Sequence, residues 1–231
     1  MKIIRMLEEL VRKVLLFLSL LILLAGCYVS YDLYQVYVRT ETESLQKYKP
    51  DQGETFAAEE LSKDCIGWLT IEGTNIDYPV MQGKDNLEYL NKDPYGEYSL
   101  SGSIFLDVRC EKDFSSEYSL LYGHHMEYGA MFGALDDFSD KEYFDEHRRG
   151  TLTVGEKTYE ITLFAFVETD TMDTGIFDPS ENGGPMVSIR EKAKIFCEPD
   201  EGKILCMSTC KTPYSIRRTC VFGILREGED E

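Results

Sequence analysis

Two apolar runs near the C-terminus constrain the fold most. The first, Ile204–Cys210, ends in a cysteine, and the second, Val221–Leu225, follows a short segment with turn composition and two arginines. Two runs of this kind joined by a turn indicate an antiparallel hairpin. Strand side chains alternate between faces, so a symmetric turn centred near Tyr214 puts Arg218 opposite Cys210 on the same face. The sequence therefore predicts a cysteine and an arginine side by side at the end of a sheet, with Arg217 pointing away or in the turn.

A histidine ends a third apolar run, Leu120–His124, far upstream. A cysteine, a histidine and an arginine at strand ends are the parts that acyl transfer through a thioester needs. The thiolate attacks a carbonyl, the imidazolium protonates the leaving amine, and the guanidinium holds the substrate backbone or the oxyanion. His125 is expected to face elsewhere, which argues against a metal site formed by the two histidines. For Cys210 by itself, an inert strand cysteine is the alternative.

The rest of the chain alternates between short strands and helical segments. Helices are expected at 54–63, 126–138, 141–147 (with Asp140 as a capping candidate) and 185–197, and a short helical turn at 86–90. Strands are expected at 68–71, 76–81, 104–107 and 119–122, with a hairpin formed by 151–154 and 157–167. The connection 169–202 is long enough to carry function or structure of its own.

The N-terminus has the composition of a membrane anchor. Val14–Ser30 is nearly all apolar and long enough to approach a bilayer's thickness, and four basic residues precede it. Because a basic flank stays in the cytoplasm, the body is expected outside the cell. We predict a cytoplasmic stub and single-pass helix at 1–38, a linker and helical arm at 39–64, and the catalytic domain at 65–231. Leu24–Cys27 also fits a lipobox, which would make the protein a lipoprotein at Cys27; the apolar and aromatic residues beyond Cys27 favour the uncleaved helix.

Charge and cysteine content limit which partners, metals and disulfides are expected for this protein. The formal net charge is −18, with 42 acidic against 24 basic residues, which argues against binding nucleic acid. Seven cysteines in an exported protein normally suggest disulfides. A nucleophilic Cys210 must stay a free thiol, however, and the cysteine spacings match no zinc pattern. We therefore predict no obligatory disulfide, no metal and no cofactor.

These segments together resemble the sortases, and class B in particular. Ser208-Thr209-Cys210 matches the end of that family's Thr-Leu-x-Thr-Cys signature, although the opening Thr-Leu is replaced here. Tyr122-Gly123-His124 matches the histidine segment, and Arg218 matches the arginine on the next strand. The class B matches are Asn75–Gln82, Asp85-Asn86, Tyr89-Leu90 and Ser101–Asp107, so the resemblance covers roughly 65–225.

The resemblance implies a mainly β fold: a closed, mostly antiparallel eight-stranded barrel with peripheral helices. It also implies that Cys210 is the nucleophile, His124 the acid and Arg218 the catalytic arginine. The positions that line the class B substrate pocket are matched by Asn86, Leu90, Tyr122 and Ser208, for which ordinary structural roles are equally open.

The activity implied is that of a membrane-anchored, extracytoplasmic cysteine transpeptidase. Such an enzyme cleaves a C-terminal sorting motif of exported proteins and transfers them to an amine of a peptidoglycan precursor. A pilus-polymerising sortase that uses a pilin lysine and an inactive sortase-like binding module are the alternatives. L,D-transpeptidases also pair cysteine with histidine, but their Ser-His-Gly-Cys motif is absent here.

Overall fold

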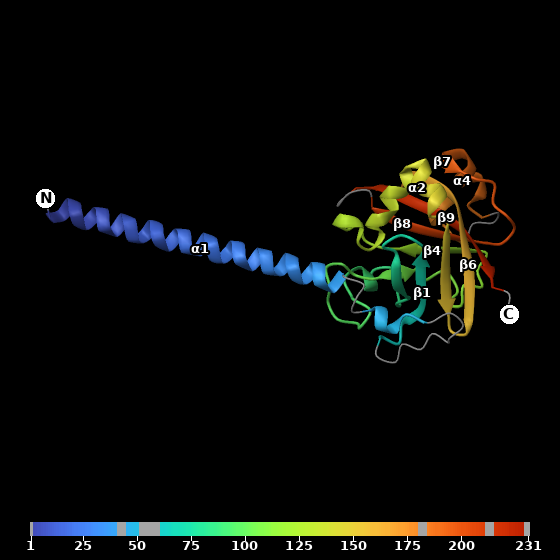
Figure 1. Cartoon of the computed structure of the whole chain (residues 1–231), viewed down its shortest axis with the longest axis horizontal. Helices are drawn as coiled ribbons and strands as arrows, with labels where there is room; N and C mark the ends of the chain where they lie inside the picture. The colour runs from blue at the N-terminus through green and yellow to red at the C-terminus, as the bar shows by residue number, and fades with distance from the viewer. Residues whose placement is uncertain (1, 41–44, 51–60, 180–183, 211–214, 229–231) are drawn as a thin grey trace. The chain divides into compact units, whose positions relative to one another are not determined.

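The N-terminal unit is a single helix. The computed structural model describes residues 2–40, 45–50, 61–179, 184–210 and 215–228, and it divides into two units, residues 1–39 and 40–231 (Figure 1). Helix α1 is Lys2–Thr40, and its 33 residues up to Tyr34 are long and apolar enough to cross a membrane. At about 1.5 Å per residue they span roughly 50 Å, more than the hydrocarbon core of a bilayer. Their apolar side chains are exposed, which is favourable in lipid and costly in water.

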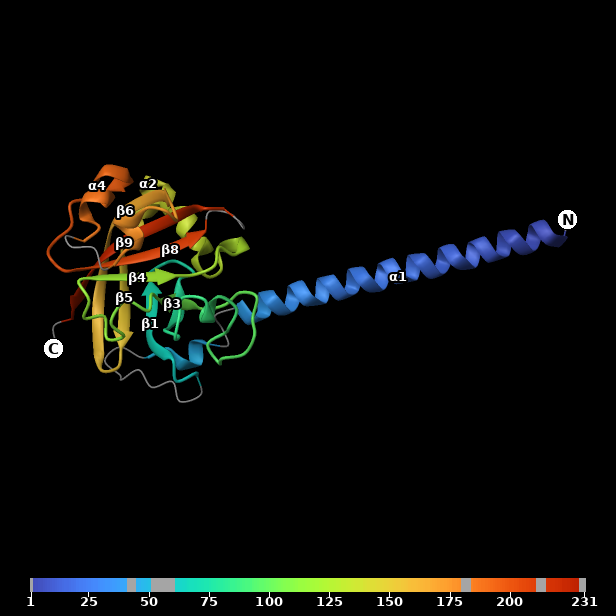
Figure 2. The ribbon, with the colours of Figure 1, turned by 180° about the vertical axis from the view of Figure 1, so that it is seen from behind.

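The second unit is built on a β-barrel (Figures 1 and 2). Eight strands pair in the order β5-β1-β2-β3-β4-β8-β9-β6, and β6 pairs back onto β5 to close the ring. Pairing is parallel at β2–β3 and β4–β8 and antiparallel elsewhere in the ring. The strands are β1 Cys65–Ile71, β2 Asp77–Met81, β3 Ile104–Leu106, β4 Tyr118–Tyr122, β5 Arg149–Val154, β6 Lys157–Asp170, β8 Lys203–Cys210 and β9 Arg217–Glu227. The predicted eight-stranded closed barrel is confirmed, as are its two hairpins.

A ninth strand, β7 (Ala193–Phe196), lies outside the ring and corrects one prediction. The sequence pattern predicted a helix over 185–197, but only α4, Met186–Lys192, is helical. The reason is tertiary. Strand β6 is longer than β5, and β5 pairs only with the first half of β6. The free edge of the second half of β6 pairs with β7. The backbone groups of that edge find partners in β7, and an isolated sequence segment carries no sign of this.

The segment after His124 corrects a second prediction. The helix predicted over 126–138 is two 3₁₀ pieces, η4 Glu127–Gly129 and η5 Phe132–Ser139. Tyr128 and Met131 have positive φ (60° and 51°), a conformation that interrupts an α-helix. The helix predicted over 141–147 is confirmed as α2, Lys141–Glu146, where the backbone N of Tyr143 donates to the Asp140 cap (2.9 Å).

Short helices complete the periphery. They are η2 Gln46–Tyr48, η3 Glu88–Leu90 and α3 Thr174–Phe177. Of the helix predicted over 54–63, residues 54–60 lie outside the described residues. The barrel core is rich in fully buried phenylalanine, and η5 adds Phe132, Leu135 and Phe138 to it while packing against β8 and β9. This packing fixes η5 beside the strands that carry the predicted cysteine and arginine.

Candidate active site

The β8–β9 hairpin has the register that the sequence predicted. Cys210 is the direct cross-strand partner of Arg218. Arg217 pairs instead with Asp170 of β6 in the backbone ladder, and its side chain is exposed. The Arg218 Nη1 donates to the carbonyl oxygens of Ser215 (2.7 Å) and Arg217 (3.1 Å), while residues 211–214 lie outside the described part of the chain. A thiol and a guanidinium thus leave neighbouring strands at one level and on one face.

His124 reaches the same strand end through the parallel pairing of β4 with β8. Tyr122 is the partner of Ser208, so the positions two residues further along each chain are His124 and Cys210. Two hydrogen bonds extend the contact past the ladder: Gly123 N donates to Ser208 O (3.1 Å), and Thr209 Oγ1 donates to Gly123 O (2.8 Å). The three predicted catalytic residues therefore lie at the same end of three adjacent strands.

The imidazole of His124 has a defined partner. Its Nε2 lies 2.7 Å from the carbonyl oxygen of Leu90, and because a carbonyl only accepts, Nε2 carries the proton. Gly123 before it is packed so tightly that an added Cβ would lie 2.4 Å from the Ile104 side chain and 2.8 Å from Phe132. A larger residue would displace the Phe132 ring or the Ile104 side chain, so this close packing helps to fix where His124 emerges.

The four predicted substrate-binding residues differ in whether their side chains have hydrogen-bond partners within the protein. Asn86 donates through Nδ2 to Asp107 Oδ2 (2.9 Å), and its Oδ1 accepts from Val108 N (2.9 Å). The Tyr122 hydroxyl also donates to Asp107 Oδ2 (3.0 Å). Ser208 is buried and accepts from the Cys220 thiol at 3.6 Å. Asn86, Tyr122 and Ser208 thus have internal hydrogen-bond partners, so their structural roles are well supported.

Leu90 is the member of this set that contacts the predicted catalytic histidine, through its carbonyl. Its side chain packs with the buried Met81, Tyr89 and Phe105 cluster, to which Tyr122 also belongs. The segment that carries Asn86 and Leu90 is therefore packed against the barrel and hydrogen-bonded to His124.

The carboxylate of Asp107 lies at the centre of this arrangement, and it was not among the predicted site residues. Its side chain has no solvent exposure and accepts from Arg109, Asn86 and Tyr122. Burial raises its pKa, but the hydrogen bonds of Arg109 and Tyr122 outweigh this effect, and the pKa falls below the ordinary value. Arg109 in turn donates to Phe177 O (2.8 Å). An acid that ends an apolar strand two residues before an arginine was the available signal.

Burial affects three of the other thiols of the body. It raises the pKa of Cys65 to about 12 and that of Cys110 to about 11, and it also raises the pKa of Cys206. Since the thiolate is the nucleophile, these three are poor candidates. Cys210 is only half-buried at the strand end, and all seven cysteines are free thiols in the structure. Within the described ranges, no group of three His, Cys, Asp or Glu residues is arranged to hold a metal ion.

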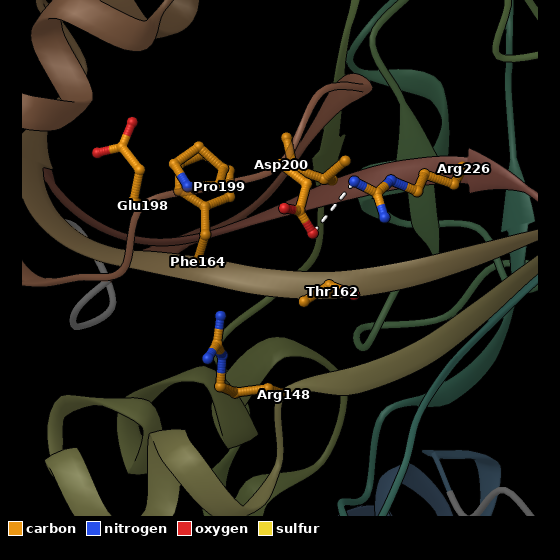
Figure 3. A pocket seen from close by; sticks show the side chains of 8 residues that line it. Arg148, Thr162, Phe164, Glu198, Pro199, Asp200 and Arg226 are labelled. Carbon is orange, nitrogen blue, oxygen red and sulfur yellow. Dashed lines mark ion pairs between the residues drawn. The ribbon is translucent and has the colours of Figure 1, made fainter.

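Two cavities lie elsewhere on the barrel. Figure 3 shows one of about 30 Å³, where Arg226 pairs with Asp200 (3.1 Å). Arg226 is eight residues along β9 from Arg218, which corresponds to about 26 Å of strand. The second cavity, of about 570 Å³, shares Arg148 and Thr162 with the first. The lining of both contains none of the predicted site residues.

Comparison with known proteins agrees with this geometry. Residues 69–225 match the family model described as a sortase domain. The chain is 31% identical over 189 residues to Sortase B of Staphylococcus aureus, covering 79% of this chain and 72% of that protein. A Streptococcus pyogenes class B sortase involved in pilus biogenesis has a TM-score of 0.66 at 36% identity, covering 72% of this chain and 94% of the other. The Staphylococcus aureus sortase B–substrate complex has a TM-score of 0.68 at 29% identity, with coverage of 85% and 94%.

Proposed function

Because the chain belongs to the class B sortases, a family of cysteine transpeptidases, we propose that it is a membrane-anchored, extracytoplasmic enzyme that cleaves a C-terminal sorting motif of exported proteins and joins them to an amine of the cell wall. The observation that carries the proposal is the pairing of Cys210 with Arg218, with His124 at the adjoining strand end. We propose that these three side chains serve as nucleophile, proton donor and fixed cation around one reacting carbonyl.

The proposed reaction has two steps. The Cys210 thiolate adds to the scissile carbonyl, and Arg218 donates hydrogen bonds to the oxyanion that develops. The C–N bond then breaks, and His124 gives its proton to the departing amine, leaving a thioester on Cys210. In the second step an acceptor amine attacks the thioester and loses its proton to His124. The C–S bond breaks, a new amide forms, and the thiolate is restored. Water in place of the amine would give hydrolysis.

A peptide substrate and an amine acceptor are the partners we propose. A substrate complex of the Staphylococcus aureus relative supports an interaction with a sorting-motif peptide. A pilin lysine is the second candidate acceptor, and the similarity to a class B sortase involved in pilus biogenesis, at 36% identity, favours testing it. The pocket residues we propose are Asn86, Leu90, Tyr122 and Ser208. Among them, Leu90 accepts a hydrogen bond from His124 through its carbonyl oxygen.

The anchor is proposed to be uncleaved and to leave the N-terminus in the cytoplasm. Cys27 lies inside α1, and the helix continues beyond it, which supports a spanning helix over a lipidated terminus. Four basic residues before the apolar stretch support the orientation. Intact-mass analysis of the membrane form distinguishes the two anchors: an unmodified N-terminal segment is expected, and a chain that starts at lipidated Cys27 would establish the lipoprotein form.

The activity is tested with the full-length protein in detergent and a library of five-residue sorting-motif peptides. Each peptide is offered alone, with a peptidoglycan-type amine, or with a lysine peptide. We expect a peptide adduct on Cys210 by mass spectrometry, and a ligated product only when an amine is present. Peptide binding with no adduct would establish the inactive binding module instead, and the preferred amine separates wall anchoring from pilus assembly.

A further inference from the structure

Each of the three proposed catalytic residues has a sequence neighbour whose side chain is hydrogen-bonded to another segment. Thr209, before Cys210, donates through Oγ1 to the Gly123 carbonyl (2.8 Å). Thr219, after Arg218, donates through Oγ1 to Asp136 Oδ1 (3.2 Å). The Nε2 of His125, after His124, lies 2.8 Å from Asp136 Oδ2. Because strand side chains alternate, the Thr209 and Thr219 contacts lie on the face opposite Cys210 and Arg218. His125, just past the end of β4, reaches the same carboxylate as Thr219.

Asp136 is the member that joins separate chain segments. One carboxylate oxygen binds His125, three residues past the end of β4, and the other binds β9 through Thr219. The carboxylate projects from η5, whose Phe132 and Leu135 are fully buried in the core. The start of η5 is itself attached to the histidine segment, since Phe132 N donates to His124 O (3.1 Å). The carboxylate is thus presented by a segment that core packing holds in place.

We propose that Asp136 is a positioning residue, which holds His124 and Arg218 at the spacing around Cys210 that thioester formation requires. The inference rests on the proposed function, and Asp136 touches neither the substrate nor the reacting atoms. It acts through His125 and Thr219, each one residue from a catalytic group. A displacement of about 1 Å at a reacting centre can cost about 100-fold in rate, so a small relaxation of these strand ends is enough to slow the chemistry.

If Asp136 had only a structural role, its replacement would lower the melting temperature and leave the rate of the folded enzyme unchanged. The positioning role predicts mainly a loss of rate. The side chains of His125 and Asp136 are 23% and 45% exposed, and an ion pair with this much exposure contributes little to folding. Loss of the Asp136 carboxylate should lower the melting temperature by only a few degrees, through the buried Thr219 hydroxyl that loses its acceptor. The rate of the chemical step should fall, because the two strand ends lose their shared partner.

The main experiment compares Asp136→Ala with Asp137→Ala in the full-length protein. Asp137 is the adjacent, exposed acid and serves as the matched control. We expect Asp136→Ala to lower kcat about tenfold with KM unchanged, and Asp137→Ala to match the parent. His125→Ala combined with Asp136→Ala should be no slower than Asp136→Ala by itself, because both changes break one network. Additive losses would contradict the shared network.

Thr219 provides a second variant pair that is independent of the charge. Thr219→Ser keeps the hydroxyl that donates to Asp136, and Thr219→Val removes it at similar volume. Activity near the parent for serine and a kcat loss for valine are expected. Equal activity of the two variants would overturn the role of this hydrogen bond, even if Asp136→Ala proved unstable.

A readout other than turnover keeps this inference separate from the proposed function. The pH dependence of Cys210 alkylation by iodoacetamide, followed by peptide mass spectrometry, reports on the charge beside the thiol. We expect the Asp136→Ala profile to move towards that of His124→Ala, while Asp137→Ala follows the parent. If the parent transfers no peptide but the profile moves, positioning stands and the transfer function fails. If both acid variants match the parent in kcat and in alkylation, the inference is wrong.

Discussion

Replacing Asp107 by asparagine tests how much one buried carboxylate contributes to the site's frame. Its Oδ1 accepts from the backbone N and the Nε of Arg109, both at 2.9 Å. Its Oδ2 accepts from Arg109 Nη2 (2.8 Å), Asn86 Nδ2 (2.9 Å) and Tyr122 OH (3.0 Å). An asparagine keeps one oxygen and turns an NH₂ group towards the remaining donors. In either orientation at least two of these hydrogen bonds are lost.

The magnitude follows from the number and kind of bonds lost. A hydrogen bond to a charged group is worth about 1.5–3 kcal/mol, so two lost bonds cost about 3–6 kcal/mol. The Arg109 side chain is 44% exposed, and water can replace part of what it loses, so we expect the lower end, about 3 kcal/mol. For a chain of this size, that corresponds to a melting temperature lower by about 6–12 °C.

The assay follows the fluorescence of the single tryptophan during thermal unfolding of the full-length protein in detergent. Trp68 is 2% exposed in the body, so its emission reports the barrel and not α1. Asp113→Asn is the control, because an asparagine can still accept from Ser115 N, and a change within about 0.5 kcal/mol is expected. A loss below about 1 kcal/mol for Asp107→Asn would refute the reasoning.

The pH dependence supplies a sign test of the same prediction. The folded-state pKa of Asp107 lies below its ordinary value near 4, because the hydrogen bonds from Arg109 and Tyr122 outweigh the raising effect of burial. A depressed pKa gives stability that is present above the unfolded pKa and is lost as pH falls through the folded pKa. The difference between the parent and Asp107→Asn should therefore shrink below about pH 4. A constant difference down to pH 2 would contradict this assignment.

Three further predictions concern the proposed chemistry. Cys210→Ala should abolish peptide turnover, measured by chromatography, with little change in melting temperature, because the covalent route is lost while the strand end is only half-buried; product at the parent rate would place the nucleophile elsewhere. Arg218→Lys should lower kcat/KM by roughly 100-fold, because an ammonium lacks the two parallel donors of a guanidinium. Arg217→Lys should leave kcat/KM nearly unchanged, and the reverse pattern would overturn the assignment. Iodoacetamide at pH 8 should label Cys65 and Cys110 far more slowly than an ordinary thiol. Their pKa values of about 12 and 11 leave only about one thiolate in 10⁴ and 10³ molecules, respectively. Peptide mapping that finds rapid labelling of either cysteine in the folded protein would contradict their burial.

Local patterns in the sequence were sufficient for the elements whose partners are near in the chain. The alternation of side chains and the length of the turn were enough to predict that Cys210 pairs with Arg218, and the structure has that register. The same holds for the hairpin of β5 and β6. The apolar run near the N-terminus predicted a long apolar helix, and α1 is one. In these cases the decisive interactions lie within a strand, a hairpin or one helix, so that composition and spacing carry the information.

Contacts between distant segments could not be read in this way. The hydrogen bond between Thr209 and Gly123 joins residues 86 positions apart, and no pattern within either segment specifies it. The resemblance to a family suggested that His124 and Cys210 act together, but the parallel pairing of β4 with β8 is what aligns their positions. The same limit explains the helix wrongly predicted over the residues of β7, which became a strand because β6 had a free edge.

The carboxylates that order the site show the physical reason most clearly. In the sequence, Asp107 and Asp136 are two of 42 acidic residues. Asp107 stands out only as an acid that ends an apolar run two residues before an arginine, and no comparable pattern marks Asp136. In the fold, each becomes the shared acceptor of donors from separate segments, Arg109, Asn86 and Tyr122 in one case and His125 and Thr219 in the other. Strand periodicity is a property of neighbouring residues, whereas a shared hydrogen-bond acceptor exists only after the barrel has closed and buried the surfaces that bring its donors together.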